Sequence, residues 1–187
     1  MPVWLTDAEY RTLSALCARL IPADGETPAA DELGAPDYID QLLGAFLFDP
    51  PRIWAGGPTS GRHGGAHAFA DFMVLSPLEE LAWRMRIEGS AGLAEREFNG
   101  PVTGWQERYR AGLAALGGDF ADAAPDEQDV RIDAHDEFVS LVYEHCCEGV
   151  YGAPEYGGNR QGRGWAAIRF AGDVQPRGYT DDEVTGR

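Results

Sequence analysis

Residues 6–20, TDAEYRTLSALCARL, decide the fold of this chain. Thr6 and Glu9 form a T-x-x-E capping box, which satisfies the unpaired amide groups in the first turn of a helix. Apolar residues follow at the i, i+3, i+4, i+7 spacing of one helical face: Leu13, Leu16, Cys17 and Leu20. The stretch predicts an amphipathic helix packed on a core, with Cys17 as a buried thiol.

Four more helices are expected: from about 36 to 47, from Ser76 to Gly89, from Thr103 to Gly117, and from about 134 to 148. Ser76 with Glu79, and Thr103 with Gln106, repeat the capping-box pattern. The apolar stripe of the Ser76 helix consists of Leu78, Leu81, Ala82 and Met85. The fold class predicted is mainly α, a small helical domain of about five helices over residues 1–148 with long loops.

The helical period stops after Gly149, where the chain becomes rich in glycine, proline, tyrosine and arginine. Residues 149–187 are therefore expected to form an extended C-terminal docking arm packed on the same domain. Trp165, Ile168 and Phe170 fit a short strand or an extended segment in that arm.

Charge excludes two classes of partner. The chain has 31 acidic and 15 basic residues, all of the latter arginine, for a net charge of −16. A phosphate backbone or an anionic membrane surface attracts basic proteins, so we expect no nucleic-acid binding and no membrane adhesion. No stretch approaches the roughly 20 apolar residues of a membrane span.

The cysteines and the start of the sequence bear on location. Three cysteines with one adjacent pair are not a disulfide framework, which favours a reducing compartment without excluding one bridge. The first residues resemble neither a signal peptide nor a twin-arginine leader. A cytoplasmic location is expected, with a trimmed leader or export alongside a partner left open.

Candidate catalytic groups are few. His63 and His67 have an H-x3-H spacing and, with Asp71, could hold a metal, although they lie in a glycine-rich stretch. A stand-alone metal-binding protein or metalloenzyme that uses them is the alternative function. His145 is expected as a hydrogen-bonded core residue, and Cys146 and Cys147 beside it diverge on a helix, so no thiol dyad is expected.

No nucleophile elbow, Walker loop or dinucleotide fingerprint occurs, so this chain should not bind FAD through a unit of its own. A partnerless helical stress or storage protein is a third, weaker interpretation.

An ordered set of residues near the C-terminus resembles a known family. The matching elements are Glu148-Gly149, Tyr156-Gly157-Gly158-Asn159, Gly164-Trp165, Ile168 with Phe170, Ala171-Gly172, Pro176 and Gly178-Tyr179. The stretch LIPADGETPAADELGAPDYID at residues 20–40 adds to the match. Together they resemble the gluconate 2-dehydrogenase subunit 3 family, the small subunits of FAD-dependent gluconate, glucose and glucoside dehydrogenases.

The resemblance implies a small helical subunit without chemistry of its own. Its expected partner is a large GMC-type oxidoreductase subunit that holds the FAD cofactor and oxidises sugars, glycosides or polyols. No cofactor or metal is expected in this chain.

The composition of the arm indicates where such a partner would bind. Aromatic and arginine side chains are enriched at the centres of protein interfaces, and glycine and asparagine tolerate positive φ angles. The predicted partner-binding residues are Trp54, Tyr156, Gly157, Gly158, Asn159, Arg160, Trp165 and Tyr179. The alternative is that the arm wraps around its own helical core, and both can hold for different side chains.

Overall fold

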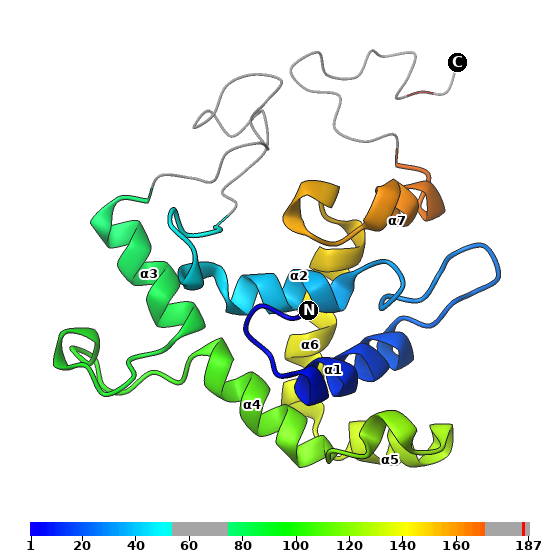
Figure 1. Cartoon of the computed structure of the whole chain (residues 1–187), viewed down its shortest axis with the longest axis horizontal. Coiled ribbons are helices and arrows are strands. Elements are labelled where there is room, and N and C mark those ends of the chain that lie inside the picture. Colours follow the sequence, from blue (N-terminus) through cyan, green and yellow to red (C-terminus); the bar gives the residue numbers. More distant parts are fainter. Residues whose placement is uncertain (54–74, 171–184, 186–187) are drawn as a thin grey trace.

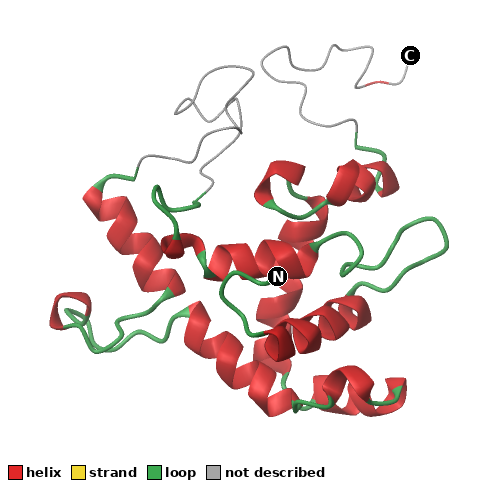
Figure 2. Cartoon of the chain, viewed as in Figure 1, coloured by secondary structure: helices red, strands yellow, loops and turns green. Residues whose placement is uncertain are grey.

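The computed structural model describes residues 1–53, 75–170 and 185, and within these it contains helices and no strand. The α-helices are α1 (Asp7–Leu20), α2 (Ala35–Leu43), α3 (Pro77–Ile87), α4 (Trp105–Leu116), α5 (Pro125–Asp133), α6 (Asp136–Tyr151) and α7 (Arg163–Ala167). Short 3-10 turns lie at Ala45–Leu47, Ala94–Arg96, Phe120–Asp122, Pro154–Tyr156 and Arg160–Gly162. The predicted mainly α fold is confirmed (Figure 2).

Helix α6 runs through the middle of the molecule, and α1, α2, α4, α5 and α7 pack against it (Figure 1). One apolar core joins α1, α2, α4 and α6 and includes Leu13, Leu16, Val142 and Phe120, all fully buried. Burial of a leucine or phenylalanine side chain contributes about 1.5–3 kcal/mol, so this core is the main source of stability. Helix α3 joins the molecule through a smaller cluster around Ile53 and Ile87.

Local sequence signals set the helix starts at two places. The side chains of Thr6 and Ser76 each accept a hydrogen bond from the backbone amide of the glutamate three residues later. The side chains of those glutamates, Glu9 and Glu79, accept hydrogen bonds from the backbone amides of Thr6 and Ser76. Both capping boxes predicted there are confirmed. The box predicted at Thr103 is wrong, because α4 begins after Gly104 without a side-chain cap.

A buried carboxylate fixes the first residues of the chain. Asp40 on α2 is almost completely buried and accepts hydrogen bonds from the backbone amides of Val3, Trp4 (3.0 Å) and Leu5 (2.8 Å). Several amides on one carboxylate satisfy a charge that would otherwise be costly to bury. The segment before α1 is thereby tied to α2.

One helix is absent from the sequence prediction, and one predicted apolar stripe faces away from the core. Helix α5 was not expected; it has a single buried residue, Gln128, and therefore no apolar period to detect. The stripe Leu78, Leu81, Ala82 and Met85 of α3 faces outward, since Ile87 is the one fully buried residue of that helix.

Over residues 149–170, the continuous part of the predicted extended arm that is described, the structure also differs from the prediction. Helix α6 continues past residue 148 to Tyr151, and the chain then forms two 3-10 turns and α7, which pack on the helical domain. The strand considered around Trp165 and Ile168 is wrong. The backbone of this segment makes tight turns through four residues with positive φ angles: Gly157, Asn159, Gln161 and Gly162.

Candidate functional site

Three glycines bring separate backbone segments into close contact at the end of α6. A Cβ atom at Gly158 would lie under 3.0 Å from the carbonyl oxygen of Gly149, and one at Gly164 would meet the carbonyl oxygen of Val150 equally closely. At Gly149, the nearest atom would be the Cα of Ala35 on α2, at 3.0 Å. Backbone atoms have no rotamer with which to give way, so only glycine fits here. These glycines are the ones that the C-terminal sequence pattern contains.

Asn159 holds this arrangement together. Its backbone amide donates to the carbonyl of Gly149 (2.6 Å), its Nδ2 donates to the carbonyl of Gly152 (2.8 Å), and its Oδ1 accepts from the amide of Gly164 (2.8 Å). Its φ angle is 43°, in the left-handed region that asparagine tolerates better than most residues. Asn159 has an exposed fraction of 0%, so its side chain supports the fold of the segment from inside.

Arg160 connects the C-terminal segment to the first turn of α2 and to the residues just before it. Its amide donates to the carbonyl of Leu33 (2.9 Å), and its guanidinium forms an ion pair with Asp37. Asp37 also accepts a hydrogen bond from the hydroxyl of Tyr10 (2.5 Å). The two stretches that carry the family resemblance are therefore in direct contact.

Glu148 and Tyr156 both lie near Tyr38 on α2. The hydroxyl of Tyr38 donates to Glu148 (2.8 Å), and burial together with this carboxylate raises the pKa of Tyr38. Tyr156 is half-buried and lines, with Tyr38, Gln41, Trp83 and others, a cavity of about 90 Å³. Gly157 has a φ angle of 100°, which lets the chain turn beside Gln41.

Trp165 lies partly under the surface of this segment. Its indole Nε1 donates to the carbonyl of Tyr151 (2.8 Å), and its ring meets that of Phe170 edge to face, with 5.3 Å between centroids. Tyr151, Ile168 and Phe170 remain exposed, at 38%, 54% and 41%. The chain thus keeps several apolar side chains in water beside the indole.

Two exposed arginines lie among these side chains. Arg163 and Arg169 are exposed, and within the described ranges no carboxylate forms an ion pair with either. Residues 156–170 contain no acid. We define the basic aromatic surface as Tyr151, Arg163, Trp165, Ile168, Arg169 and Phe170.

Trp165 is the one residue of this surface among the partner-binding residues predicted from the sequence. Tyr151, Ile168 and Phe170 are the more exposed residues, whereas Gly158 and Asn159, predicted as contacts, are buried. Trp54, Tyr179, His63 and His67 lie outside the described residues. Among the residues that are described, no group of three or more His, Cys, Asp or Glu side chains could hold a metal ion, and no helix is long and apolar enough to cross a membrane.

The three adjacent residues His145, Cys146 and Cys147 point to different partners, as predicted. The Sγ of Cys146 lies 3.2 Å from the Sγ of Cys17, both buried in the core, and burial raises the pKa of Cys17. The Nδ1 of His145 is 2.8 Å from the hydroxyl of Tyr109. The prediction that Cys17 and His145 are core residues is confirmed.

Lowering the pH from 7 to 5 is expected to remove about 2 kcal/mol of stability through His145 alone. Burial, followed by the positive charge of Arg108, lowers the pKa of His145 from 6.5 to about 4. The unfolded chain therefore binds the proton first, and this part of the stability is present above pH 6.5 and lost as the pH falls towards 4. Urea unfolding at several pH values measures how the free energy of unfolding changes with pH. This change should be smaller in His145→Gln than in the original chain. An equal change in both proteins would contradict the assignment.

Comparison with known proteins supplies the family. No curated protein and no solved structure matches the chain. The family model described as gluconate 2-dehydrogenase subunit 3 matches residues 7–172, which include α1 to α7 and the whole basic aromatic surface. The chain therefore belongs to the gluconate 2-dehydrogenase subunit 3 family and is a small subunit of a dehydrogenase complex.

Proposed function

We propose that this chain is a non-catalytic subunit that binds, and stabilises or helps to mature, a large FAD-dependent GMC-type oxidoreductase. That partner holds the flavin and oxidises sugars, glycosides or polyols. The observation that carries the proposal is the basic aromatic surface, which keeps apolar and cationic side chains in water on a tightly held segment.

The composition of this surface favours a protein partner. Aromatic and arginine side chains contribute most of the binding energy in many interfaces, because they bury large areas and make forked contacts with carboxylates. Arg163 and Arg169 are suited to acidic side chains on the partner. The rest of this chain is strongly acidic, so an acidic surface on the partner is attracted to this surface and repelled by the rest of the chain.

The rigidity of the segment supports the same conclusion. Asn159 and the glycines at 149, 158 and 164 fix its backbone before any partner arrives. A surface that is already ordered loses less conformational entropy on binding, which leaves more of the contact energy as affinity.

The experiment is co-expression of this chain with a flavoprotein of the GMC type encoded beside it. Size-exclusion chromatography should give one peak that contains both chains and absorbs near the flavin maximum. A flavoprotein that elutes alone, with this chain soluble and monodisperse in a separate peak, would contradict the proposal.

Trp165→Ala is expected to weaken this complex by about 2 kcal/mol or more, roughly 30-fold in Kd. The substitution removes the indole that supports Phe170 and its hydrogen bond to Tyr151. Titration calorimetry measures the affinity, and thermal unfolding of the free chain separates binding from folding. Tyr143→Ala, at a half-exposed tyrosine on α6, is the control. Equal Kd values for the two variants would remove Trp165 from the interface.

A further inference from the structure

Helix α3 turns an apolar face towards water. Leu78 and Leu81 are 75% and 38% exposed, and Met85 lies one turn further along the same face. The other side of α3 holds Ile87, fully buried, and Trp83. Leucines at i and i+3 on the outer side of a helix are unusual in a chain with ample charge, and contiguous exposed apolar side chains mark binding sites.

The loop between α3 and α4 adds to this face. Phe98 is 94% exposed and Val102 is 42% exposed. Together with Leu81, Met85, Arg96 and Asn99 they border a groove of about 220 Å³ between the loop and the helix. We define the α3 apolar face as Leu78, Leu81, Met85, Phe98 and Val102.

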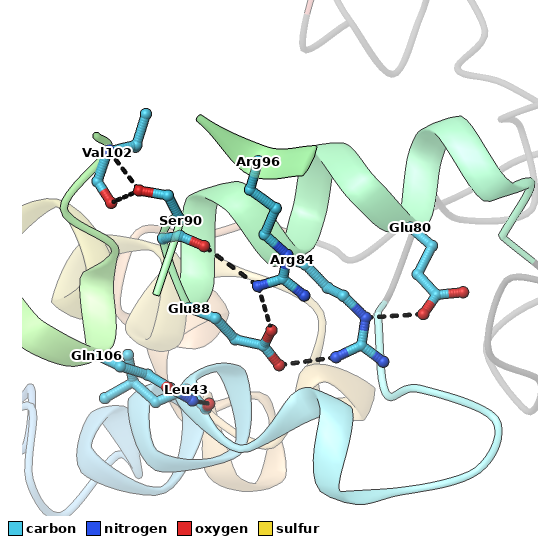
Figure 3. A network of polar contacts seen from close by, with 9 residues as sticks. Leu43, Glu80, Arg84, Glu88, Ser90, Arg96, Val102 and Gln106 are labelled. Carbon is cyan, nitrogen blue, oxygen red and sulfur yellow. Dashed lines mark hydrogen bonds and ion pairs between the residues drawn. The ribbon is translucent and has the colours of Figure 1, made fainter. Parts of the chain in front are cut away.

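Hydrogen bonds close the base of this loop, and they hold Phe98 in its exposed position. The Val102 amide donates to the Ser90 hydroxyl at 2.7 Å, and that hydroxyl donates to the Val102 carbonyl at 3.2 Å (Figure 3). The Ser90 amide also donates to the Val102 carbonyl, at 2.9 Å. Gly89 and Gly104 lie so close that a Cβ on either would meet the backbone of the other at under 3.0 Å.

Two arginines beside this face are paired with acids of α3 and of its C-terminal cap. Arg84 lies between Glu80 and Glu88, at 2.7 Å from each, and Arg96 contacts Glu88 at 2.8 Å (Figure 3). Glu95, beside the groove, is exposed and leaves the rim acidic. An occupant should therefore offer apolar side chains flanked by arginine or lysine.

A symmetric pair of copies through this face does not meet that requirement, and a head-to-tail pair would cover the basic aromatic surface, which the proposed function assigns to the flavoprotein. Each copy carries a net charge of −16, and a symmetric pair would place the acidic rims against each other. A different protein with a basic rim satisfies both the apolar groove and the charge.

We infer that the α3 apolar face is a second docking surface for the large flavin-binding subunit, taking a segment with an aliphatic or aromatic side chain beside arginine or lysine. The inference rests on the function proposed above and adds where, and with what chemistry, the partner binds. Helix α2 lies between α3 and α7 (Figure 1), so a partner that contacts both surfaces must be large enough to reach past α2. The rim of the α3 apolar face is acidic and the basic aromatic surface is cationic, and this difference in charge favours one orientation of the partner.

The test is titration of the flavoprotein with the double variant Leu81→Ser, Phe98→Ser. Since both side chains are exposed, the melting temperature of the free chain should stay within about 2 °C of the original, while the Kd rises by about 30-fold or more. Val130→Ser, which removes a 69% exposed valine on α5, is the matched control and should leave the Kd unchanged. Glu95→Arg should weaken binding roughly tenfold at low salt, with the difference fading as salt is raised.

The outcomes separate the two ideas. Binding by the original chain with an unchanged Kd for the double variant would overturn the inference and leave the proposed function standing. Failure of the original chain to bind would overturn the proposed function and the inference with it. A free chain that dimerises, and loses its dimer in the double variant, would assign the face to a second copy and overturn the inference.

Discussion

Gly158→Ala is expected to destabilise the folded chain by about 3 kcal/mol. The new Cβ would lie under 3.0 Å from the carbonyl oxygen of Gly149, a backbone atom that can move only if the end of α6 moves with it. That movement would also break the hydrogen bond from the amide of Asn159 to Gly149, which is 2.6 Å long. Both costs arise from a single methyl group.

Thermal unfolding followed by circular dichroism measures this effect as a fall in Tm of roughly 10 °C for a chain of this length. Gly118→Ala is the control, because Gly118 has open space around its Cα and no positive φ angle. Its Tm should stay close to the original value. Equal melting temperatures for the two variants would show that the segment around Gly158 does not lie against the end of α6 as described.

The parts of the fold that sequence reasoning predicted are those with a local physical signal. The capping residues Thr6 and Ser76 have short hydroxyl side chains placed three residues before a glutamate, and the bonds that they form are local. The buried positions of Leu13, Leu16 and Cys17 follow from their spacing on one helical face.

The parts that it missed depend on distant contacts. Gln106 was expected to close a capping box, but its side chain donates to the carbonyl of Leu43, 63 residues away in sequence (2.8 Å; Figure 3). Helix α5 is stabilised by polar contacts such as the bond from Gln128 to the carbonyl of Phe120 (2.8 Å) and the ion pair of Asp129 with Arg19. No period in the local sequence announces such contacts.

The stripe on α3 shows the limit of periodicity most clearly. Spacing identifies which residues share a face, but it does not say whether the face meets the core or a partner. Leu78 and Leu81 share a face as predicted, and that face is exposed.

The candidate site divides in the same way. Composition and the family resemblance pointed to residues 149–187, because aromatic, arginine and glycine residues gather there. They did not separate the residues that build the segment from those that face outward. Asn159 is buried because its amide matches two backbone groups at once, which depends on the left-handed turn that it adopts.

Purified alone, this chain is expected to show no sugar-dependent reduction of a dye acceptor, while the complex with its flavoprotein turns over. Among the described residues, two side chains suited to acid–base or nucleophilic work lie in the core. His145 is almost fully buried with its pKa lowered to about 4, and burial raises the pKa of Cys17. Groups held in those states, and away from water, are poor proton carriers and nucleophiles near neutral pH.

The comparison needs the free chain, the free flavoprotein and the complex at equal concentrations. Gluconate, glucose and a glucoside serve as substrates, with flavin absorbance and metal content measured on each sample. The chain should add stability or yield to the flavoprotein without adding a redox group.

The most direct test is the rate of dye reduction by the isolated chain, set against that of the complex. We predict a rate at background for this chain, with all flavin on the larger polypeptide. Turnover of a sugar by the isolated chain, or a flavin or metal ion that stays bound to it through purification, would contradict the account.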